Sequence, residues 1–513
     1  MIIIRDIKLE KMDESKLEAK IRRLIKRDQF KYTVYRRSID ARKGILYNYQ
    51  VLVEGKFSEK EVKRIKNAAF YNEESYELTP GEKKPSVCVV GFGPCGIFAS
   101  YLLSKYGIPV TVIERGSKVE ERMKKIDDFL HGGTLDENTN VQFGEGGAGT
   151  FSDGKLTSRS KDKRVREVLK TFVEYGAPSD ILIDQKPHIG TDVLSEIIVK
   201  IRKDLVQKEV DFHFDTTMED IVVEKGKITK ILTDKGDFTA DYYIFALGNS
   251  PRDTLFQLKD KISMSNKPFA VGYRIEHPQE LIDLSQYKTK SEELPPASYQ
   301  LSHSKENQRG VYTFCMCPGG YVVNSSSEEG RLCVNGMSYH SRDGENANSA
   351  IVCGIGEEVY GTNLLDGVRF QREIEEKAFQ LGGGNYNAPV QRIEDYLSDT
   401  PTTSFGRIKP TVKPGYTMTN LNGIYPKIVD DYIKEALSAM GRKIKGFDQK
   451  DAVLTGVETR TSCAVRLDRE DNMRSIGISN LYPCGEGAGY AGGIVSSAID
   501  GLKAAEQIIE NKE

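Results

Sequence analysis

Residues 87–96 read VCVVGFGPCG, a short apolar run followed directly by a glycine-rich turn. The run at 87–90 predicts a buried strand, and residues 97–106 predict a helix that continues out of the turn. A second apolar run at 110–113 ends at Glu114. Together these segments predict one complete βαβ unit, the context in which a G-x-G-x-x-G turn binds a dinucleotide.

The residue types in this unit each have a physical reason. Gly91 permits a tight turn, Gly93 lets backbone N–H groups approach a pyrophosphate, and Gly96 allows close helix–strand packing. The helix N-terminus favours the anion through its unpaired N–H groups and its dipole. Glu114 lies 18 residues beyond Gly96, where a carboxylate can accept hydrogen bonds from ribose hydroxyls. The cofactor-binding residues predicted here are Gly91, Gly93, Pro94, Cys95, Gly96, Glu114 and Arg115.

This unit alone does not distinguish FAD from NAD, because both use the same first half-site. Three further glycine-rich segments lie at 143–154, 243–250 and 481–494. Any one of them could be an ordinary loop, since glycine is common in turns. An extended FAD, however, needs small residues wherever backbone touches it closely, and four such segments favour FAD. They add these predicted cofactor contacts: Gly146, Gly147, Gly149, Ser152, Gly154, Lys155, Ala246, Gly248, Gly485, Glu486, Gly492, Gly493 and Ile494.

From about residue 85 to the end, the chain resembles the bacterial FAD-dependent dehydrogenase-like proteins, described as NAD(FAD)-utilising dehydrogenases, of the two-dinucleotide-binding-domain flavoprotein superfamily. The stretches that carry the resemblance are GFGPCG, FGEGGAGTFSDGKL, ALGNSPRDT, FCMCPGG, NGMSYHSRDGENANSA, VETRTS and PCGEGAGYAGGI. In related flavoproteins an acid in the last of these stretches lies against the ribityl or pyrophosphate region. That role would fall to Glu486, although many relatives have Gly-Asp where this chain has Gly485-Glu486.

The resemblance implies an α/β protein with a Rossmann-like FAD-binding domain that is split in sequence. The implied pieces of that domain are 85–160, 205–255 and 450–513, and an α+β substrate-side domain takes 161–204 and 256–449. Independently, short strand candidates follow one another at 210–214, 221–224, 227–233 and 238–246, as expected for a β-meander that leads back to the FAD sheet. Residues 494–509 predict a closing helix.

Residues 1–80 predict a separate small α+β module. One helix face carries Leu17, Ile21 and Ile25, and alternating apolar residues at 47–53 predict a half-buried strand. The expected order is β-α-β-β with a second helix near 59–70. Residues 1–84 contain 21 Lys and Arg against 14 Asp and Glu. A solvated helix face explains this charge better than an RNA-binding patch, because the aromatic-glycine motifs of RNA-binding sheets are missing.

The flavin carries the hydride chemistry, so the protein needs only to orient the reactants and supply charge and a proton route. Arg460 and Lys155 are candidates to stabilise negative charge on reduced flavin or on a carboxylate or enolate substrate. His188, in a Pro-His-Ile-Gly turn, is a candidate acid or base. The alternative for each is structural: a salt-bridge partner for the two cations and a satisfied, partly buried histidine.

Cys315 and Cys317 would point the same way if 314–318 is extended, but a Cys-x-Cys disulfide would be strained, so free thiols are expected. No second glycine-rich βαβ for NAD(P)H is evident. The run at 381–385 reads as a helix C-cap and loop. We therefore expect the electron donor or acceptor to dock transiently or to be the substrate itself.

Composition narrows the remaining possibilities. The chain has 513 residues, a formal net charge of −2 and eight cysteines, so it predicts a globular protein with reduced thiols in the cytoplasm. No cysteine or histidine spacing predicts a metal site. The uncharged stretch 86–104 contains glycine and proline in its middle, which argues against a membrane span. The leading hypothesis is an FAD-dependent oxidoreductase acting on a small organic substrate, and the alternative is an RNA-associated, tRNA-modifying flavoprotein.

Overall fold

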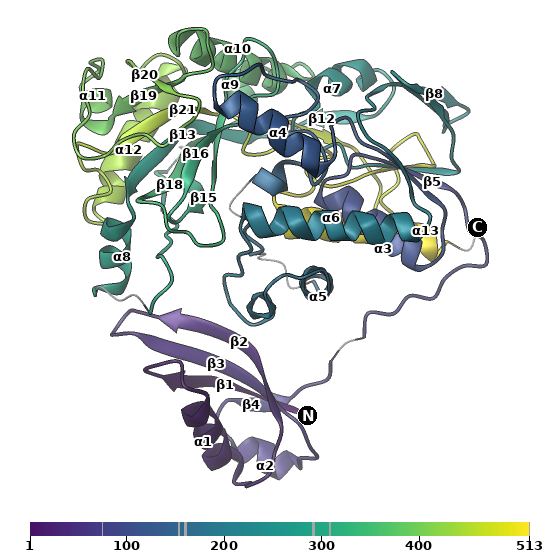
Figure 1. Ribbon diagram of the computed structural model, residues 1–513, viewed down its shortest axis with the longest axis vertical. Coiled ribbons are helices and arrows are strands. Elements are labelled where there is room, and N and C mark those ends of the chain that lie inside the picture. Colours follow the sequence, from purple (N-terminus) through teal and green to yellow (C-terminus); the bar gives the residue numbers. More distant parts are fainter. Residues whose placement is uncertain (74, 152–153, 158–161, 290–292, 307–308, 512–513) are drawn as a thin grey trace.

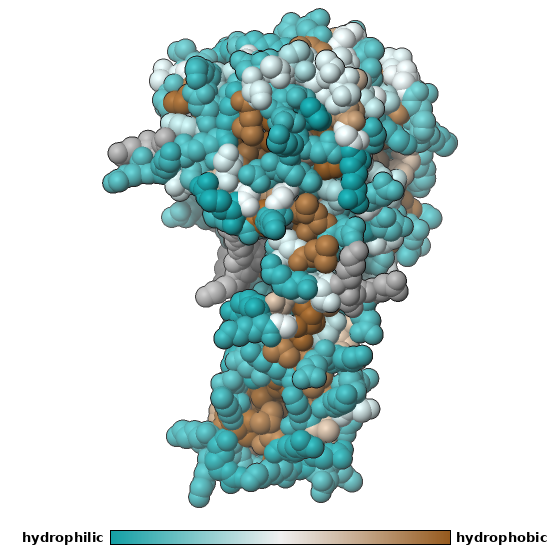
Figure 2. Space-filling view, turned by 90° about the vertical axis from the view of Figure 1, so that its left-hand side faces the viewer, coloured by the Kyte–Doolittle hydropathy of each residue, from teal (hydrophilic) through white to brown (hydrophobic). Residues whose placement is uncertain are grey.

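The computed structural model describes residues 1–513 except 74, 152–153, 158–161, 290–292, 307–308 and 512–513. A small N-terminal module lies below a larger body that contains the two main sheets (Figure 1). Figure 2 shows the module as a narrower lobe, on a face that is largely hydrophilic with separate apolar patches. No helix in the described part of the chain is both long and apolar enough to cross a membrane.

The N-terminal module has the β-α-β-β-α-β order of a ferredoxin-like fold. Its elements are β1 (Ile2–Leu9), α1 (Glu14–Ile25), β2 (Tyr32–Asp40), β3 (Leu46–Val53), α2 (Glu59–Arg64) and β4 (Ala68–Phe70). They form a sheet in the order β2-β3-β1-β4. The helix expected over 59–70 is shorter than predicted, because the backbone becomes extended at Ile65. The residues that follow form β4, which pairs with β1. This pairing gives backbone partners to a strand that would otherwise lie at the sheet edge.

The module contacts the body through the edge strand β2. The backbone of Arg37 donates to Ile183 O and accepts from Gln185 N, and its guanidinium pairs with Asp184 at 2.8 Å. Through these backbone hydrogen bonds, a short segment of the body pairs with the edge strand of the module's sheet.

A five-stranded parallel sheet forms the centre of the nucleotide-binding half, in the order β23-β11-β5-β6-β7. Its strands are β5 (Val87–Val90), β6 (Val110–Ile113), β7 (Asp211–His213), β11 (Tyr242–Phe245) and β23 (Leu481–Pro483). They come from three separate stretches of the chain. One face packs against α3 (Pro94–Lys105) and α13 (Ile494–Ile509), and the other against a small sheet of β8 (Met218–Glu224), β9 (Lys227–Thr233) and β10 (Gly236–Phe238). The predicted α/β fold with a Rossmann-like unit is confirmed.

Two sequence expectations differ from this structure. The strand expected over 238–246 is divided, because β10 ends at Phe238 and β11 begins at Tyr242 in another sheet. Residues 161–204 were expected in the substrate-side domain. Their helices α5 (Arg164–Glu174) and α6 (Thr191–Gln207) instead share a buried core with α3 and α13. The apolar faces of α5 and α6 pack against the apolar side chains of these two helices. The other domain boundaries stay predictions.

The second half of the body is built on a larger, mostly antiparallel sheet in the order β14-β15-β18-β13-β21-β19-β20. Its strands are β13 (Phe269–Pro278), β14 (Ser302–His303), β15 (Val311–Cys317), β18 (Asn346–Ile355), β19 (Ala388–Arg392), β20 (Tyr416–Met418) and β21 (Val453–Glu458). Helices α10 (Asp366–Leu381) and α12 (Lys427–Gly441) contribute to its core. The glycine run after Leu381 follows a helix, as expected.

The remaining elements surround these sheets. They are α4 (Val119–Leu130), α7 (Arg252–Leu258), β12 (Met264–Asn266), α8 (Gln279–Tyr287), β16 (Tyr321–Asn324), β17 (Val334–Met337), α9 (Glu357–Tyr360), α11 (Ile393–Leu397) and β22 (Val465–Leu467).

Candidate functional site

A cavity of about 1220 Å³ lies between the two main sheets. On one side it meets the carboxyl ends of β5, β6 and β11, at Val90, Ile113 and Ala246. On the other side it reaches the large sheet at Phe314 and Glu458. Open α/β sheets bind ligands outside the carboxyl ends of their strands, so the cavity has the expected position for a nucleotide.

The GFGPCG turn has the geometry that its glycines predicted. Gly91 has a φ of 97°, and a Cβ at Gly96 would collide with the Gly91 carbonyl. A Cβ at Gly93 would meet nothing closer than Gly147 Cα at 3.6 Å, and Gly93 lines the cavity. Gly93 is also the N-cap of α3 and provides no side-chain cap. The first N–H groups of α3 are therefore left for an anion in the cavity.

Within the protein, Glu114 accepts hydrogen bonds from three backbone N–H groups. Its Oε2 accepts from Phe92 N at 2.7 Å, and its Oε1 accepts from Gly116 N and Gly144 N, each at 3.0 Å. The carboxylate thus ties the first turn to the second glycine segment. Because each carboxylate oxygen can accept two hydrogen bonds, Oε2 retains capacity for a ribose hydroxyl.

The second glycine segment is shaped by Arg122, a residue that the sequence did not single out. Its guanidinium is fully buried and donates to carbonyl oxygens from Asn140 to Gly147. Five N–H donors in a rigid fork can hold several carbonyls at once. Arg122 therefore orders the loop that forms one wall of the cavity.

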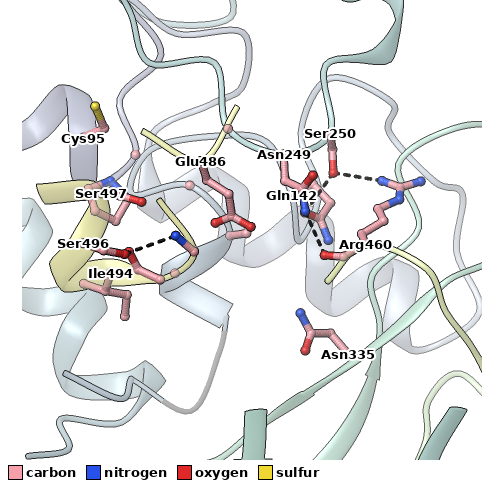
Figure 3. Close-up of a pocket in the computed structure, with 18 of the residues that line it drawn as sticks. Cys95, Gln142, Asn249, Ser250, Asn335, Arg460, Glu486, Ile494, Ser496 and Ser497 are labelled. Carbon is pink, nitrogen blue, oxygen red and sulfur yellow. Dashed lines mark hydrogen bonds between the residues drawn. The ribbon is translucent and has the colours of Figure 1, made fainter. Parts of the chain in front are cut away.

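The last glycine segment brings the N-terminus of α13 and Glu486 to the cavity (Figure 3). Gly493 is the N-cap of α13 without a side-chain cap, and Gly492 N donates to Ser496 Oγ at 3.2 Å. In Figure 3, Glu486 lies between this end of α13 and the group formed by Asn249 and Arg460. Burial raises the pKa of Glu486 to about 7, so the carboxyl group can take or hold a proton near neutral pH.

These features fit FAD. Two helix N-termini without side-chain caps open onto the cavity, and a glycine leaves room beside the first of them. Two carboxyl groups also line the cavity, the buried Glu114 and the partly exposed Glu486. Gly91, Gly93, Pro94, Cys95, Glu114 and Arg115 would hold the adenosine and pyrophosphate end, and Glu486, Gly492, Gly493 and Ile494 the ribityl and flavin end.

Most predicted contact residues come together around this cavity, although their individual roles stay predictions. Those that line it are Gly91, Gly93, Pro94, Cys95, Glu114, Arg115, Gly147, Gly149, Lys155, Ala246, Gly248, Glu486, Gly492, Gly493, Ile494 and Arg460. The predicted residues outside its lining are Gly96, Gly146, Gly154, Gly485 and His188. Ser152 lies outside the described residues.

Arg460 lines the cavity, but its charge is already matched. The guanidinium donates to both carboxylate oxygens of Glu375, at 3.0 and 2.8 Å, and also to Ser250 and Ser327 (Figure 3 shows the contact with Ser250). Glu375 is fully buried, and its second arginine partner is Arg252. The geometry agrees with the structural alternative for Arg460, a buried ion-pair partner at the cavity wall.

Lys155 and His188 pair through their backbones as an isolated β-bridge. Lys155 lines the cavity, whereas the ring of His188 stacks on His340 at a centroid distance of 5.9 Å. His188 Nε2 lies 3.3 Å from Tyr339 O. This arrangement favours the structural alternative for His188.

Glu458 and Arg274 form a site that sequence reasoning missed. Glu458 lines the cavity at the end of β21, 3% exposed, and its Oε2 lies 2.5 Å from Arg274 Nε. Arg274 is also held by Asn335 Oδ1 and Cys315 O, each at 2.7 Å. Burial raises the pKa of Glu458 to about 7, against the opposing effect of Arg274. The one available signal was its position in VETRTS, two residues before Arg460.

Cys315 and Cys317 are both free thiols, as expected. The condition for their side chains to point the same way is not met. Cys315 has a φ of 44°, and β15 carries a bulge between Phe314 and Cys317. The bulge breaks the strand alternation and leaves Cys315 on the cavity lining while Cys317 is buried.

Comparison with known proteins gives the same cofactor. Residues 84–136 match a family model described as an FAD binding domain, and residues 268–461 match one described as FAD-dependent protein, C-terminal domain-like. The chain belongs to this family of FAD-dependent proteins. It is 44% identical over 497 residues to a protein of Clostridium beijerinckii described as an uncharacterized protein, covering 94% of this chain and 93% of the relative.

Two flavoproteins of known structure are among the weak overall matches to this chain. A flavin-dependent halogenase, CmlS, is 11% identical with a TM-score of 0.37, over 83% of this chain and 59% of the halogenase. A glycine oxidase from Bacillus cereus is 10% identical with a TM-score of 0.32, over 83% of this chain and 97% of the oxidase. At this level of similarity they say nothing about the reaction of this FAD-dependent protein.

Proposed function

We propose that this protein is an FAD-dependent oxidoreductase that transfers a hydride between bound flavin and a small organic substrate. The observation that carries the proposal is the continuity of the cavity from the GFGPCG turn to the large sheet. Its volume of about 1220 Å³ exceeds the roughly 300–1,000 Å³ of most small-molecule pockets. That size supports a second ligand beside the cofactor.

The substrate would lie against the wall formed by β15 and β21. Tyr312 and Phe314 of β15, together with Tyr299 from the segment before β14, give this side of the cavity an aromatic surface, which can orient an organic molecule and exclude water. FAD supplies the hydride donor or acceptor when bound. Glu458 would hold the proton that accompanies hydride transfer, since it lines the cavity and Arg274 holds its carboxyl group in place.

A cytoplasmic location is part of the same proposal. All eight cysteines are free thiols, which supports a reducing compartment such as the cytoplasm. The RNA-associated alternative rests on the charge of residues 1–84 and stays a prediction. The expectation that the electron donor or acceptor docks transiently or is the substrate itself also stays a prediction.

Anaerobic mixing of the purified yellow protein with a panel of metabolites tests the proposal. We expect at least one organic compound to bleach the flavin absorbance band with saturating kinetics, and air to restore it. A Glu458→Gln variant should retain FAD but reduce the bleaching rate at least about 100-fold, the lower end of the 10²–10⁴-fold contribution typical of general acid–base groups. A flavin that dithionite reduces but that no organic compound in a broad panel reduces would contradict the proposal.

A further inference from the structure

The side chain of Asn335, in β17, lines the cavity, and its amide group is held in one orientation. Its Oδ1 accepts from Arg274 Nη2 at 2.7 Å and from Gly336 N at 2.8 Å. Both partners can only donate, so the oxygen of the amide must face them. The amide nitrogen is therefore on the opposite side. Figure 3 shows it directed toward the part of the cavity that contains Glu486 and Arg460.

The amide nitrogen of Asn335 is available to a ligand. Within the described part of the chain, no protein acceptor lies within hydrogen-bond distance of Nδ2. A side-chain amide nitrogen carries two N–H donors. Because the oxygen is fixed by its two partners, these donors cannot exchange places with it, and the cavity wall presents donors at this position.

Glu458 lies beside Asn335, because both side chains contact the guanidinium of Arg274. Arg274 Nη2, the nitrogen that donates to Asn335, also donates to Glu458 Oε1 at 3.4 Å. Arg274 Nη1 donates to Cys315 O and to Asn348 Oδ1. Arg274 is fully buried and outside the cavity lining, so it holds the two groups in place. The wall therefore presents a hydrogen-bond donor next to a carboxyl group that can exchange a proton.

This combination of groups distinguishes between classes of substrate. A hydroxyl group has one O–H donor and two acceptor lone pairs, so it can donate to the Glu458 carboxylate while it accepts from Asn335 Nδ2. A protonated amine has no lone pair with which to accept from Asn335, and an ionised Glu458 would repel a carboxylate. Tyr312 and Phe314 line the same side of the cavity and give the carbon frame of the molecule an apolar surface.

We propose that Asn335 and Glu458 bind the oxygen of a hydroxyl compound, or of its carbonyl product, at the carbon that exchanges the hydride. The inference rests on the proposed function and adds the substrate class, an alcohol. In the oxidation the C–H bond breaks, and its hydride reduces bound flavin by two electrons. The O–H bond also breaks: its proton passes to the Glu458 carboxylate, and its electron pair forms the second bond of the C=O group. Asn335 stabilises the negative charge that develops on the oxygen.

The test uses the FAD-loaded protein and two neutral probes of nearly equal shape. Acetophenone has a carbonyl oxygen, and α-methylstyrene has a methylene group in its place. Binding is followed as a perturbation of the flavin absorbance band and, independently, by calorimetry. We expect acetophenone to bind at least about fivefold more tightly than α-methylstyrene, because only the carbonyl oxygen can accept a hydrogen bond from Asn335.

Two variants separate ligand binding from the support that Asn335 gives to Arg274. Asn335→Asp keeps an oxygen for Arg274 but has no N–H donor, and Asn335→Ala lacks both groups. Each variant should lower the affinity for acetophenone at least about fivefold, leave α-methylstyrene binding unchanged and retain FAD. Asn472→Asp, at an exposed asparagine outside the cavity lining, should match the parent protein.

The outcomes separate this inference from the proposed function. Equal binding of the two probes, no binding of either, or parent-level acetophenone binding in Asn335→Asp would overturn the inference. An amine, or a carboxylate without a hydroxyl group, as the compound that reduces the flavin would also overturn it, while the proposed function would stand. Acetophenone binding that depends on Asn335, without flavin reduction by any organic compound, would support the oxygen site and contradict the proposed function.

Discussion

The two main sheets line one cavity, but they contribute different features to it. The five-stranded sheet has strands of three or four residues, of which β5, β11 and β23 run into glycine-rich segments, and its contribution to the site is open space beside backbone N–H groups. The seven-stranded sheet has strands of up to ten residues, and its contribution is buried charge. Arg274 and Glu458 are buried there as a pair, because an isolated ion in the interior would be strongly unfavourable.

This contrast has a consequence for mutation. On the nucleotide side an added side chain should be harmful because it fills space. On the side of the large sheet a removed charge should be harmful because it leaves its partner buried and unpaired.

The largest expected effect is on the nucleotide side. Gly93→Val places a branched side chain where the pyrophosphate is predicted, so we expect the purified protein to lose bound FAD, measured as flavin absorbance per protein. Gly354→Val is the matched control, because a Cβ there meets nothing closer than 3.7 Å and lies outside this cavity. Full FAD content in Gly93→Val, with the control behaving like the parent protein, would show that the turn does not bind the cofactor.

The second prediction concerns the charge pair of Arg460 with Glu375. Arg460→Met leaves part of a fully buried carboxylate unmatched, so we expect a loss of about 3–5 kcal/mol in the free energy of unfolding, measured by urea denaturation. Lys155→Met, at a half-buried lysine on the cavity rim, should change stability by less than about 1 kcal/mol. If Arg460→Met kept its stability but lost only turnover, Arg460 would be a catalytic residue, contrary to its paired geometry.

The smallest expected effect is a pH dependence. Burial raises the pKa of Glu486 from 4.5 to about 7, so between these values the folded protein holds a proton that the unfolded chain has released. Stability contributed by this group is therefore full below about pH 4.5 and is lost as pH rises toward 7, by about 1–3 kcal/mol.

Glu486→Gln should flatten this part of the stability profile, measured by thermal denaturation of FAD-free protein between pH 5 and 8. The control is Glu376→Gln, at an exposed glutamate of α10, which should leave the slope unchanged. If the Glu486→Gln variant showed the same dependence of stability on pH as the parent protein, the Glu486 carboxyl group would be ionised in the folded state between pH 5 and 8.

The sequence by itself determined the βαβ unit, the FAD cofactor and the closing helix α13. The reason is that a turn with positive φ, a close helix–strand approach and an apolar strand are all requirements on neighbouring residues. Gly91, Gly93 and Gly96 lie within six positions of the chain. The turn that they form could therefore be predicted from the local sequence.

Only the tertiary structure decided how the charged residues are used. Arg460 meets Glu375 across 85 residues, and Arg274 meets Glu458 across 184. Lys155 and His188 pair through their backbones although they are far apart in sequence. No local pattern distinguishes a charge that will be paired in the core from one that will face a ligand, since burial and partner are set by segments far apart in sequence. Arg460, predicted as catalytic, and Glu458, which was missed, are two residues apart, and each is paired with a residue far away in the sequence.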